Sequence, residues 1–138
     1  TSTQIGIRGN PRTLDWLQAS YDIGYQVITM DEYKELGHEK CSKMILDRLG
    51  DNPIYVTFDL DCLDATVAPG TANLEPAFRG FNIDEARKLI QCLKGKNVIG
   101  GDVACLMPTK DSPNQITSMV AASIMFEIIC LISINLKK

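Results

Sequence analysis

Hydrophobic positions alternate along the chain between short apolar runs and longer stretches with a helical period. Short runs are typical of buried strands, and apolar residues about 3.6 positions apart are typical of helices. Strands are predicted at 4–8, 25–29, 54–58 and 97–103, and helices at 31–49, 83–93 and 113–135. Strands that alternate with helices predict a mainly parallel sheet with helices on both faces. The expected fold is a three-layer α/β/α fold, in one domain over residues 1–138.

Polar and small residues mark the ends of the predicted helices. Asp31 is placed to cap the first helix, and Gly50 is placed to end it. Asn82 and Glu85 have the spacing of a capping box at the start of the second helix. The first two helices are therefore predicted from end signals as well as from the apolar period.

The last predicted helix is apolar on nearly all sides. Its only charged residue between 111 and 137 is Glu127. A helix that is apolar all round is buried. Ser118, Ser123 and Ser133 interrupt it, and its uninterrupted apolar stretch is shorter than the roughly 20 residues of a membrane span. A core or interface helix is expected, with no membrane partner.

Composition narrows the class of protein. The 138 residues are 45% hydrophobic and 22% charged, as in an ordinary soluble domain. The net charge is −3 and the 14 lysines and arginines are scattered, which argues against a nucleic-acid partner. The 5 cysteines form no Cys-x-x-Cys motif, and their odd number favours reduced thiols. An intracellular location, cytoplasmic or mitochondrial, is expected.

The candidate chemistry lies directly after the strand predicted at 54–58. Asp59, Asp61 and Asp64 follow this apolar run, and ligands of a parallel sheet bind outside the carboxyl ends of its strands. Side chains alternate along a strand, so Asp59 and Asp61 are expected on one side, where they repel one another unless a cation neutralises them. Hard oxygen ligands suit Mg, Mn or Ca. In the structural alternative, Asp64 caps a turn and the other two are solvated loop acids.

The order of residues from this strand onward is distinctive. The chain reads Thr57-Phe58-Asp59-Leu60-Asp61-Cys62-Leu63-Asp64, then Ala68-Pro69-Gly70-Thr71, then Glu75-Pro76. This order resembles the ureohydrolase family of arginases and agmatinases, and within it the agmatinase-like and plant-arginase-like sequences most closely. The segments 4–9 and 98–103 also resemble the family strands before and after it. The resemblance implies an arginase-like α/β fold, of which this chain is the C-terminal part.

The resemblance also implies an activity. The family uses two manganese ions to hydrolyse a linear guanidino compound, such as agmatine or arginine, to urea and an amine, as in polyamine metabolism. Asp59 and Asp61 match two of its metal ligands. The others, two histidines and two aspartates, come from upstream Gly-Gly-Asp-His and Asp-Ala-His-x-Asp motifs, and this sequence has neither. Activity is therefore expected only if an N-terminal half is supplied. Without that half, the strand at 4–8 has an unpaired edge that can pair with another strand. The resemblance also implies a homo-oligomer, a trimer or hexamer.

No catalytic acid or base is assigned, but Cys105 is a candidate substrate-binding residue. By resemblance it stands where the family has a Glu that pairs with the substrate guanidinium, and a neutral thiol cannot supply that charge-assisted bond. A small buried core residue is the structural alternative. Asp102 follows Gly100-Gly101 but precedes Val103 rather than His, so it is assigned to a strand. The only histidine, His38, is expected on a helix surface rather than at a metal.

Two other interpretations stay open. One is a non-catalytic ureohydrolase-like subunit or binding protein, which the loss of the Glu at position 105 favours. The Asp59 and Asp61 pair argues against it, because a protein without a metal has little physical reason to keep two unpaired carboxylates at one strand end. The other interpretation is a fragment without an independent role.

Overall fold

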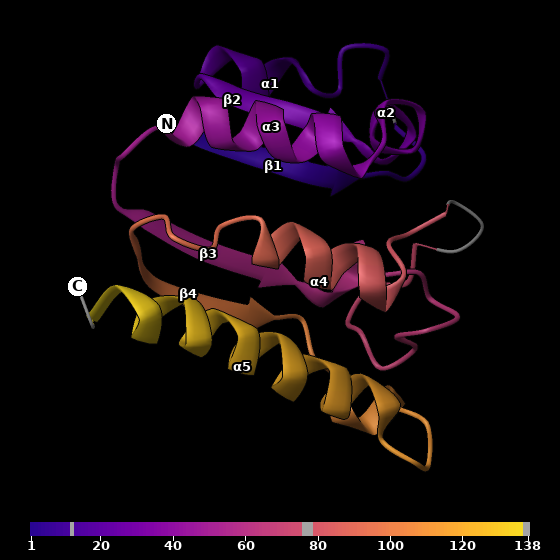
Figure 1. The fold of residues 1–138 in the computed structure, drawn as a ribbon. Coiled ribbons are helices and arrows are strands. Elements are labelled where there is room, and N and C mark those ends of the chain that lie inside the picture. The colour runs from indigo at the N-terminus through magenta and orange to yellow at the C-terminus, as the bar shows by residue number, and fades with distance from the viewer. Residues whose placement is uncertain (12, 76–78, 137–138) are drawn as a thin grey trace.

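The computed structural model describes residues 1–11, 13–75 and 79–136, in which strands and helices alternate (Figure 1). The strands are β1 (Ser2–Ile7), β2 (Tyr25–Thr29), β3 (Ile54–Asp59) and β4 (Val98–Ala104). The α-helices are α1 (Gln18–Asp22), α2 (Met30–Leu36), α3 (His38–Leu49), α4 (Ile83–Gln91) and α5 (Ile116–Leu136). Two short 3-10 helices are η1 (Leu60–Cys62) and η2 (Pro108–Lys110). The strands agree closely with the predicted ones, whereas α1 was not predicted.

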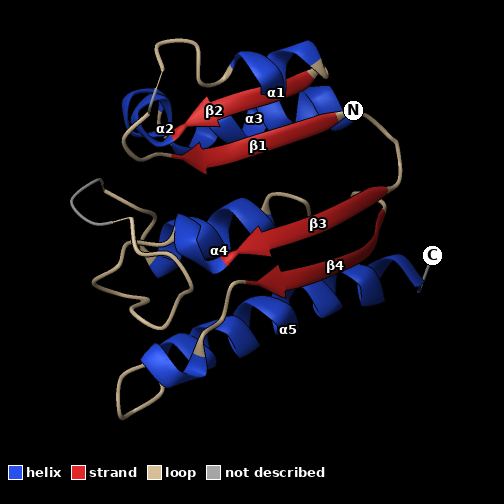
Figure 2. Cartoon of the chain, turned by 180° about the vertical axis from the view of Figure 1, so that it is seen from behind, coloured by secondary structure: helices blue, strands red, loops and turns tan. Residues whose placement is uncertain are grey.

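The strands form two parallel pairs. β1 pairs with β2, and β3 pairs with β4. Figure 2 shows all four arrows running in the same direction, with β1 beside β3. Within the described residues no hydrogen-bonded ladder joins the two pairs, so β1 and β3 each have one edge without a strand partner. The predicted mainly parallel α/β fold is confirmed.

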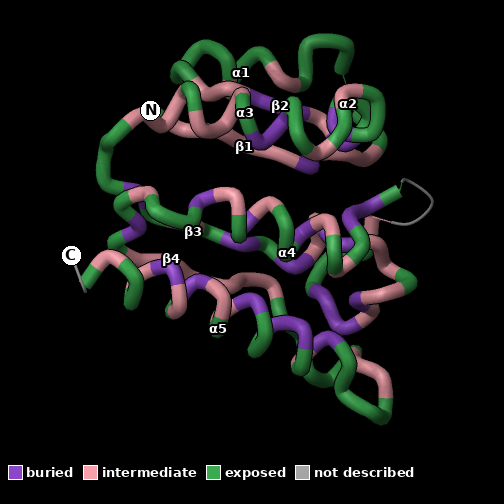
Figure 3. The backbone as a smooth tube through the Cα atoms, in the orientation of Figure 1, coloured by how far each residue is buried: buried purple, intermediate pink, exposed green. Residues whose placement is uncertain are grey.

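Helices α4 and α5 cover one face of the β3–β4 pair, in front of it in Figure 1 and behind it in Figure 2. Val56 pairs with Gly101 on this face, where a side chain at position 101 would meet Ile128 of α5 at 2.8 Å. On the other face Tyr55 is 62% exposed, and Thr57 is exposed as well. β3 is therefore not buried throughout as predicted, since burial alternates along it (Figure 3).

The helix predicted at 31–49 is two helices. α2 and α3 meet at Gly37, whose φ of 82° is a conformation that glycine adopts at low cost. The cap is also not Asp31. Thr29 accepts a hydrogen bond from the Glu32 N–H, and Glu32 accepts one from the Thr29 N–H, which makes a capping box two positions before Asp31. The capping box predicted at Asn82 and Glu85 is confirmed.

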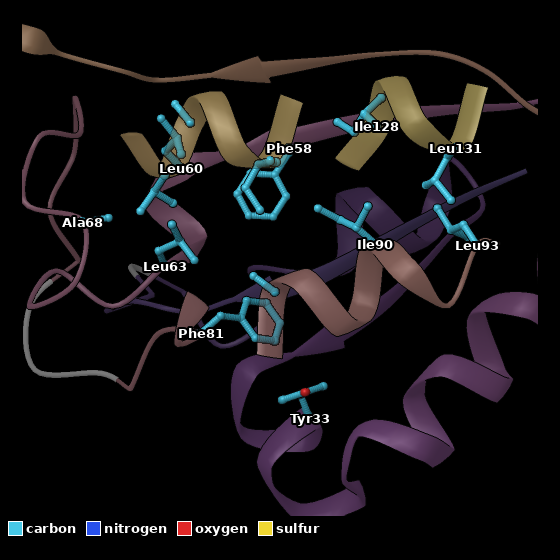
Figure 4. Packing of buried hydrophobic residues seen from close by; sticks show 14 of the residues in the cluster. Tyr33, Phe58, Leu60, Leu63, Ala68, Phe81, Ile90, Leu93, Ile128 and Leu131 are labelled. Carbon is cyan, nitrogen blue, oxygen red and sulfur yellow. The ribbon is translucent and has the colours of Figure 1, made fainter. Parts of the chain in front are cut away.

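Phe81 connects the two strand pairs through the core. Its side chain is 2% exposed, and its ring packs edge-on against Tyr33 of α2 at a centroid distance of 4.8 Å (Figure 4). Gly6 of β1 lies against the same ring, because a Cβ at that position would come within 2.3 Å of it. The Phe81 N–H donates a hydrogen bond to the Cys62 carbonyl, and the Phe81 carbonyl accepts one from the Asp64 N–H, in the segment after β3. One aromatic side chain thus packs against both halves of the fold.

Helix α5 is buried along one side only. Ile124 and Ile128 lie in the core, whereas Met119 and Phe126 are 62% and 66% exposed. The outer side of α5 lies outside the core of this chain, so only the inner side is that of a core helix, and an interface on the outer side stays a prediction. By length and composition α5 could cross a membrane, a property that it shares with core helices of globular proteins.

Candidate metal centre

The acidic residues come together at the carboxyl ends of β3 and β4. Asp59 is the last residue of β3, and Asp61 lies in η1 directly after it. Asp59 caps this helix, because its Oδ1 accepts a hydrogen bond from the Asp61 N–H at 3.2 Å. The two carboxylates are close as predicted, but the reason differs. The strand ends at Asp59, so the alternation of side chains along a strand does not apply to Asp61. The helical turn η1 brings Asp61 back toward Asp59 instead.

Cys105 completes a cluster with these two acids. It directly follows β4, in which Ala104 lies opposite Asp59, and its Sγ donates to Asp59 Oδ2 at 3.2 Å. One ligand atom from each of Asp59, Asp61 and Cys105 lies within 4.8 Å of the others. This contact was not predicted from the sequence, although both residues lie at the ends of apolar strands that a parallel sheet can place side by side.

One oxygen of the cluster has no partner. The Oδ1 atom of Asp61 exposes less than 1 Å² and accepts no hydrogen bond from any described residue. A buried carboxylate oxygen without a donor is costly, because its lost hydration is not replaced. A cation between Asp59 and Asp61 would satisfy this atom and offset the repulsion between the carboxylates. The residues present therefore fit a metal ion.

The cluster shifts the ionisation of its members. Burial and then the neighbouring Asp59 carboxylate raise the pKa of Asp61 to about 6. Burial would also raise the pKa of Asp59, but the contacts with Asp61 and Cys105 and the Asp61 N–H outweigh it and hold that pKa below its usual value. The hydrogen bond to Asp59, followed by burial, raises the pKa of Cys105 to about 12. Without a cation, Asp61 therefore keeps its proton up to about pH 6, whereas Asp59 is ionised well below that pH.

Asp64, the third acid of the loop, has a structural role. Its Oδ1 accepts from the Thr66 N–H at 3.0 Å and from the Thr66 hydroxyl at 2.6 Å, and its Oδ2 accepts from the Gly80 N–H at 3.2 Å. The Thr66 hydrogen bonds hold the pKa of Asp64 below its ordinary value. The interpretation of Asp64 as a turn cap is confirmed, which leaves Asp59 and Asp61 as the candidate ligands.

The other residues considered from the sequence lie outside the cluster. Asp102 belongs to β4 as predicted, and it accepts a hydrogen bond from the Thr57 hydroxyl at 2.8 Å. His38 opens α3, and its Nε2 lies 3.3 Å from the Ser42 hydroxyl. The imidazole is half-buried rather than fully solvated, since its Nδ1 is buried without a partner in the described residues. Pro76, which ends the Glu-Pro part of the resemblance, lies outside the described residues.

The parallel strands and the helices that cover them are those of an arginase-like α/β fold. Residues 1–131 match the model of the Arginase family, and the chain therefore belongs to this family. It is 36% identical over 132 residues to a guanidinopropionase of Pseudomonas aeruginosa, and the aligned region makes up 96% of this chain and 41% of that protein. It is 35% identical over 130 residues to an agmatinase of Photorhabdus laumondii, and the aligned region makes up 94% of this chain and 39% of that protein.

Solved structures agree with this assignment. The proclavaminate amidino hydrolase of Streptomyces clavuligerus superimposes with a TM-score of 0.85 at 34% identity, over 94% of this chain and 42% of that one. The formimidoylglutamase of Bacillus subtilis superimposes with a TM-score of 0.82 at 26% identity, over 94% and 40% of the two chains. The arginase-like fold is thus confirmed, and this chain spans about two fifths of the length of these relatives.

Proposed function

We propose that this protein takes part in the manganese-dependent hydrolysis of a linear guanidino compound to urea and an amine, with Asp59 and Asp61 as two of the metal ligands. The observation that carries the proposal is the unpartnered, buried Oδ1 of Asp61 beside Asp59. The names of the relatives support the substrate class, since guanidinopropionase, agmatinase and amidino hydrolase all refer to guanidino or amidino compounds.

The residues of this chain contribute orientation and charge. Manganese held by these residues would supply a water of lowered pKa for the hydrolysis of an amidine. Asp59 is held by the Asp61 N–H, so its carboxylate has a fixed direction at the strand end. Asp61 offers a buried oxygen that no other described residue engages. Carboxylates fixed in this way would hold a cation at this strand end.

The chain supplies only part of such a centre. By resemblance the family's histidines and its two further aspartates come from motifs that are absent from these 138 residues. We therefore expect no useful urea release from this chain alone. The reconstituted protein, defined as this chain joined behind a segment that carries the Gly-Gly-Asp-His and Asp-Ala-His-x-Asp motifs, is expected to release urea from a linear guanidino compound.

The test compares urea release and bound manganese in the reconstituted protein and in its Asp59→Asn and Asp61→Asn variants. Both variants should lose hydrolysis and tight manganese uptake, because each removes a charged ligand. Asp84→Asn is the matched control, since Asp84 lies on α4 outside the cluster and should leave both quantities unchanged. Undiminished hydrolysis in the two cluster variants would refute the proposal.

A second candidate function is a non-catalytic subunit, and the thiol at position 105 favours it. If the missing carboxylate limits substrate binding, Cys105→Glu in the reconstituted protein should raise hydrolysis roughly tenfold or more, because a charged hydrogen bond contributes about 1.5 to 3 kcal/mol. No gain with agmatine, arginine or guanidinopropionate, together with no basal hydrolysis, would favour the non-catalytic subunit.

A further inference from the structure

We propose that the thiol of Cys105 is a third ligand of the cation held by Asp59 and Asp61, and that it shifts the site's preference from manganese toward zinc, cadmium and cobalt. This inference rests on the metal site of the proposed function. It gives Cys105 a different role from the one its sequence position suggests, because the thiol then binds the cation and not the substrate.

The backbone conformation of Cys105 is fixed by hydrogen bonds to a neighbouring loop. Its φ is 66°, a left-handed conformation that residues other than glycine keep only where the surroundings fix it. Its carbonyl accepts a hydrogen bond from the Ala72 N–H at 3.0 Å, and the Met107 N–H donates to the Gly70 carbonyl at 2.8 Å. The loop at 70–72 therefore holds the chain at Cys105 and directly after it, with Sγ 3.2 Å from Asp59 Oδ2.

The spacing of the three side chains suits a small cation. Oxygen and sulfur ligands about 2.0 to 2.3 Å from a tetrahedral ion lie roughly 3.3 to 3.8 Å from one another. Cys105 Sγ lies 3.2 Å from Asp59 Oδ2, and the three ligand atoms lie within 4.8 Å of each other. Small side-chain rotations would bring all three to the distances of a shared ion.

A thiol–carboxylate hydrogen bond alone does not account for the cluster. It satisfies Asp59 but leaves Asp61 Oδ1 buried and without a partner among the described residues. A divalent cation engages all three side chains at once. It takes the place of the thiol proton, which leaves to solvent, and no electron is transferred.

The chemistry of sulfur decides the preferred ion. Carboxylates alone suit Mg and Mn, whereas a thiolate favours softer ions such as Zn. In the described residues no other cysteine belongs to a group that could hold a metal. Cys130, which lies half-buried on α5, therefore provides a matched control.

The test is a cadmium titration of the 138-residue chain, followed by the ultraviolet absorption that cadmium–thiolate bonds produce. The wild type and Cys130→Ser should develop this absorption at one ion per chain, and Cys105→Ser should lose it. Loss of a residue that only hydrogen-bonds to a metal ligand weakens metal binding roughly tenfold or more. Loss of a direct ligand should cost at least as much, so Cys105→Ser should weaken zinc binding by at least roughly tenfold, while manganese binding changes less. Equal zinc affinity in the wild type and Cys105→Ser would overturn the inference.

X-ray absorption of the zinc-loaded wild type keeps the test decisive if Cys105→Ser fails to fold. One sulfur neighbour at about 2.3 Å is expected, and a shell of oxygen and nitrogen alone would overturn the inference. If sulfur is bound but the reconstituted protein hydrolyses no guanidino compound, only the proposed function fails. If hydrolysis occurs without sulfur coordination, only the role of Cys105 fails.

Discussion

The ends of β2 and β3 are alike in position and opposite in their polar chemistry. Each strand runs directly into a helical turn that a side chain of its last residue caps. After β2, Thr29 and Glu32 satisfy one another in a capping box. After β3, Asp59 caps the turn, but Asp61 Oδ1 is left without a partner in the described residues. The polar groups at the end of β2 satisfy one another, whereas the end of β3 leaves one carboxylate oxygen without a hydrogen-bond partner in the described residues.

The largest expected effect comes from Phe81, which lies in the core between the two strand pairs. Phe81→Ala should lower the free energy of unfolding by about 3 to 5 kcal/mol, since it opens a cavity against Tyr33 and Gly6. Urea unfolding followed by circular dichroism measures this loss. Phe81→Leu refills most of the space and should cost much less. A loss below about 1 kcal/mol for the alanine variant would show that Phe81 does not couple the two halves.

The satisfied end at β2 should respond as a structural cap. Thr29→Ala should destabilise the protein by about 1 kcal/mol, because the Glu32 N–H loses its acceptor. Thr29→Ser keeps a hydroxyl and should remain close to the wild type in the same urea experiment. A loss of metal affinity in Thr29→Ala would contradict the division between the two strand ends.

The smallest expected effect on the free energy of unfolding comes from the end of β3, where the ionisation of Asp61 makes stability depend on pH. The pKa of Asp61 is raised from 3.8 to about 6, so the folded state holds this proton more tightly than the unfolded state does. The contribution of Asp61 to stability without metal should therefore fall as the pH rises from about 4 to about 6. The fall should be about 1 kcal/mol or less, because solvent screens a partly exposed carboxyl.

Two changes should abolish this pH-dependent fall. Asp61→Asn removes the titrating group, and saturating cation replaces the proton of Asp61. Urea unfolding at a series of pH values, with and without added metal, provides the measurement. The same change of stability with pH in the wild type and in Asp61→Asn would count against a strained carboxylate pair.

The sequence predicts the strands and the acidic pair better than it predicts their exact contacts. Apolar runs mark buried strands directly, and the spacing of Asp59 and Asp61 places both at one strand end. The break at Gly37 escaped prediction because the apolar period continues across it. The contact between Cys105 and Asp59 also escaped, because it depends on the pairing register of β3 and β4 and on a left-handed residue after β4. Register and turn geometry are set by tertiary packing, which local patterns do not encode.

The central claim is that Asp59 and Asp61 together hold a cation, and manganese binding tests it most directly. In the reconstituted protein, free manganese measured by electron paramagnetic resonance should show tight uptake. Asp61→Ala should abolish that uptake, because it leaves the ion short of a ligand and Asp59 without compensation. Asp84→Ala should bind manganese as the wild type does. Unchanged uptake in Asp61→Ala would contradict the account.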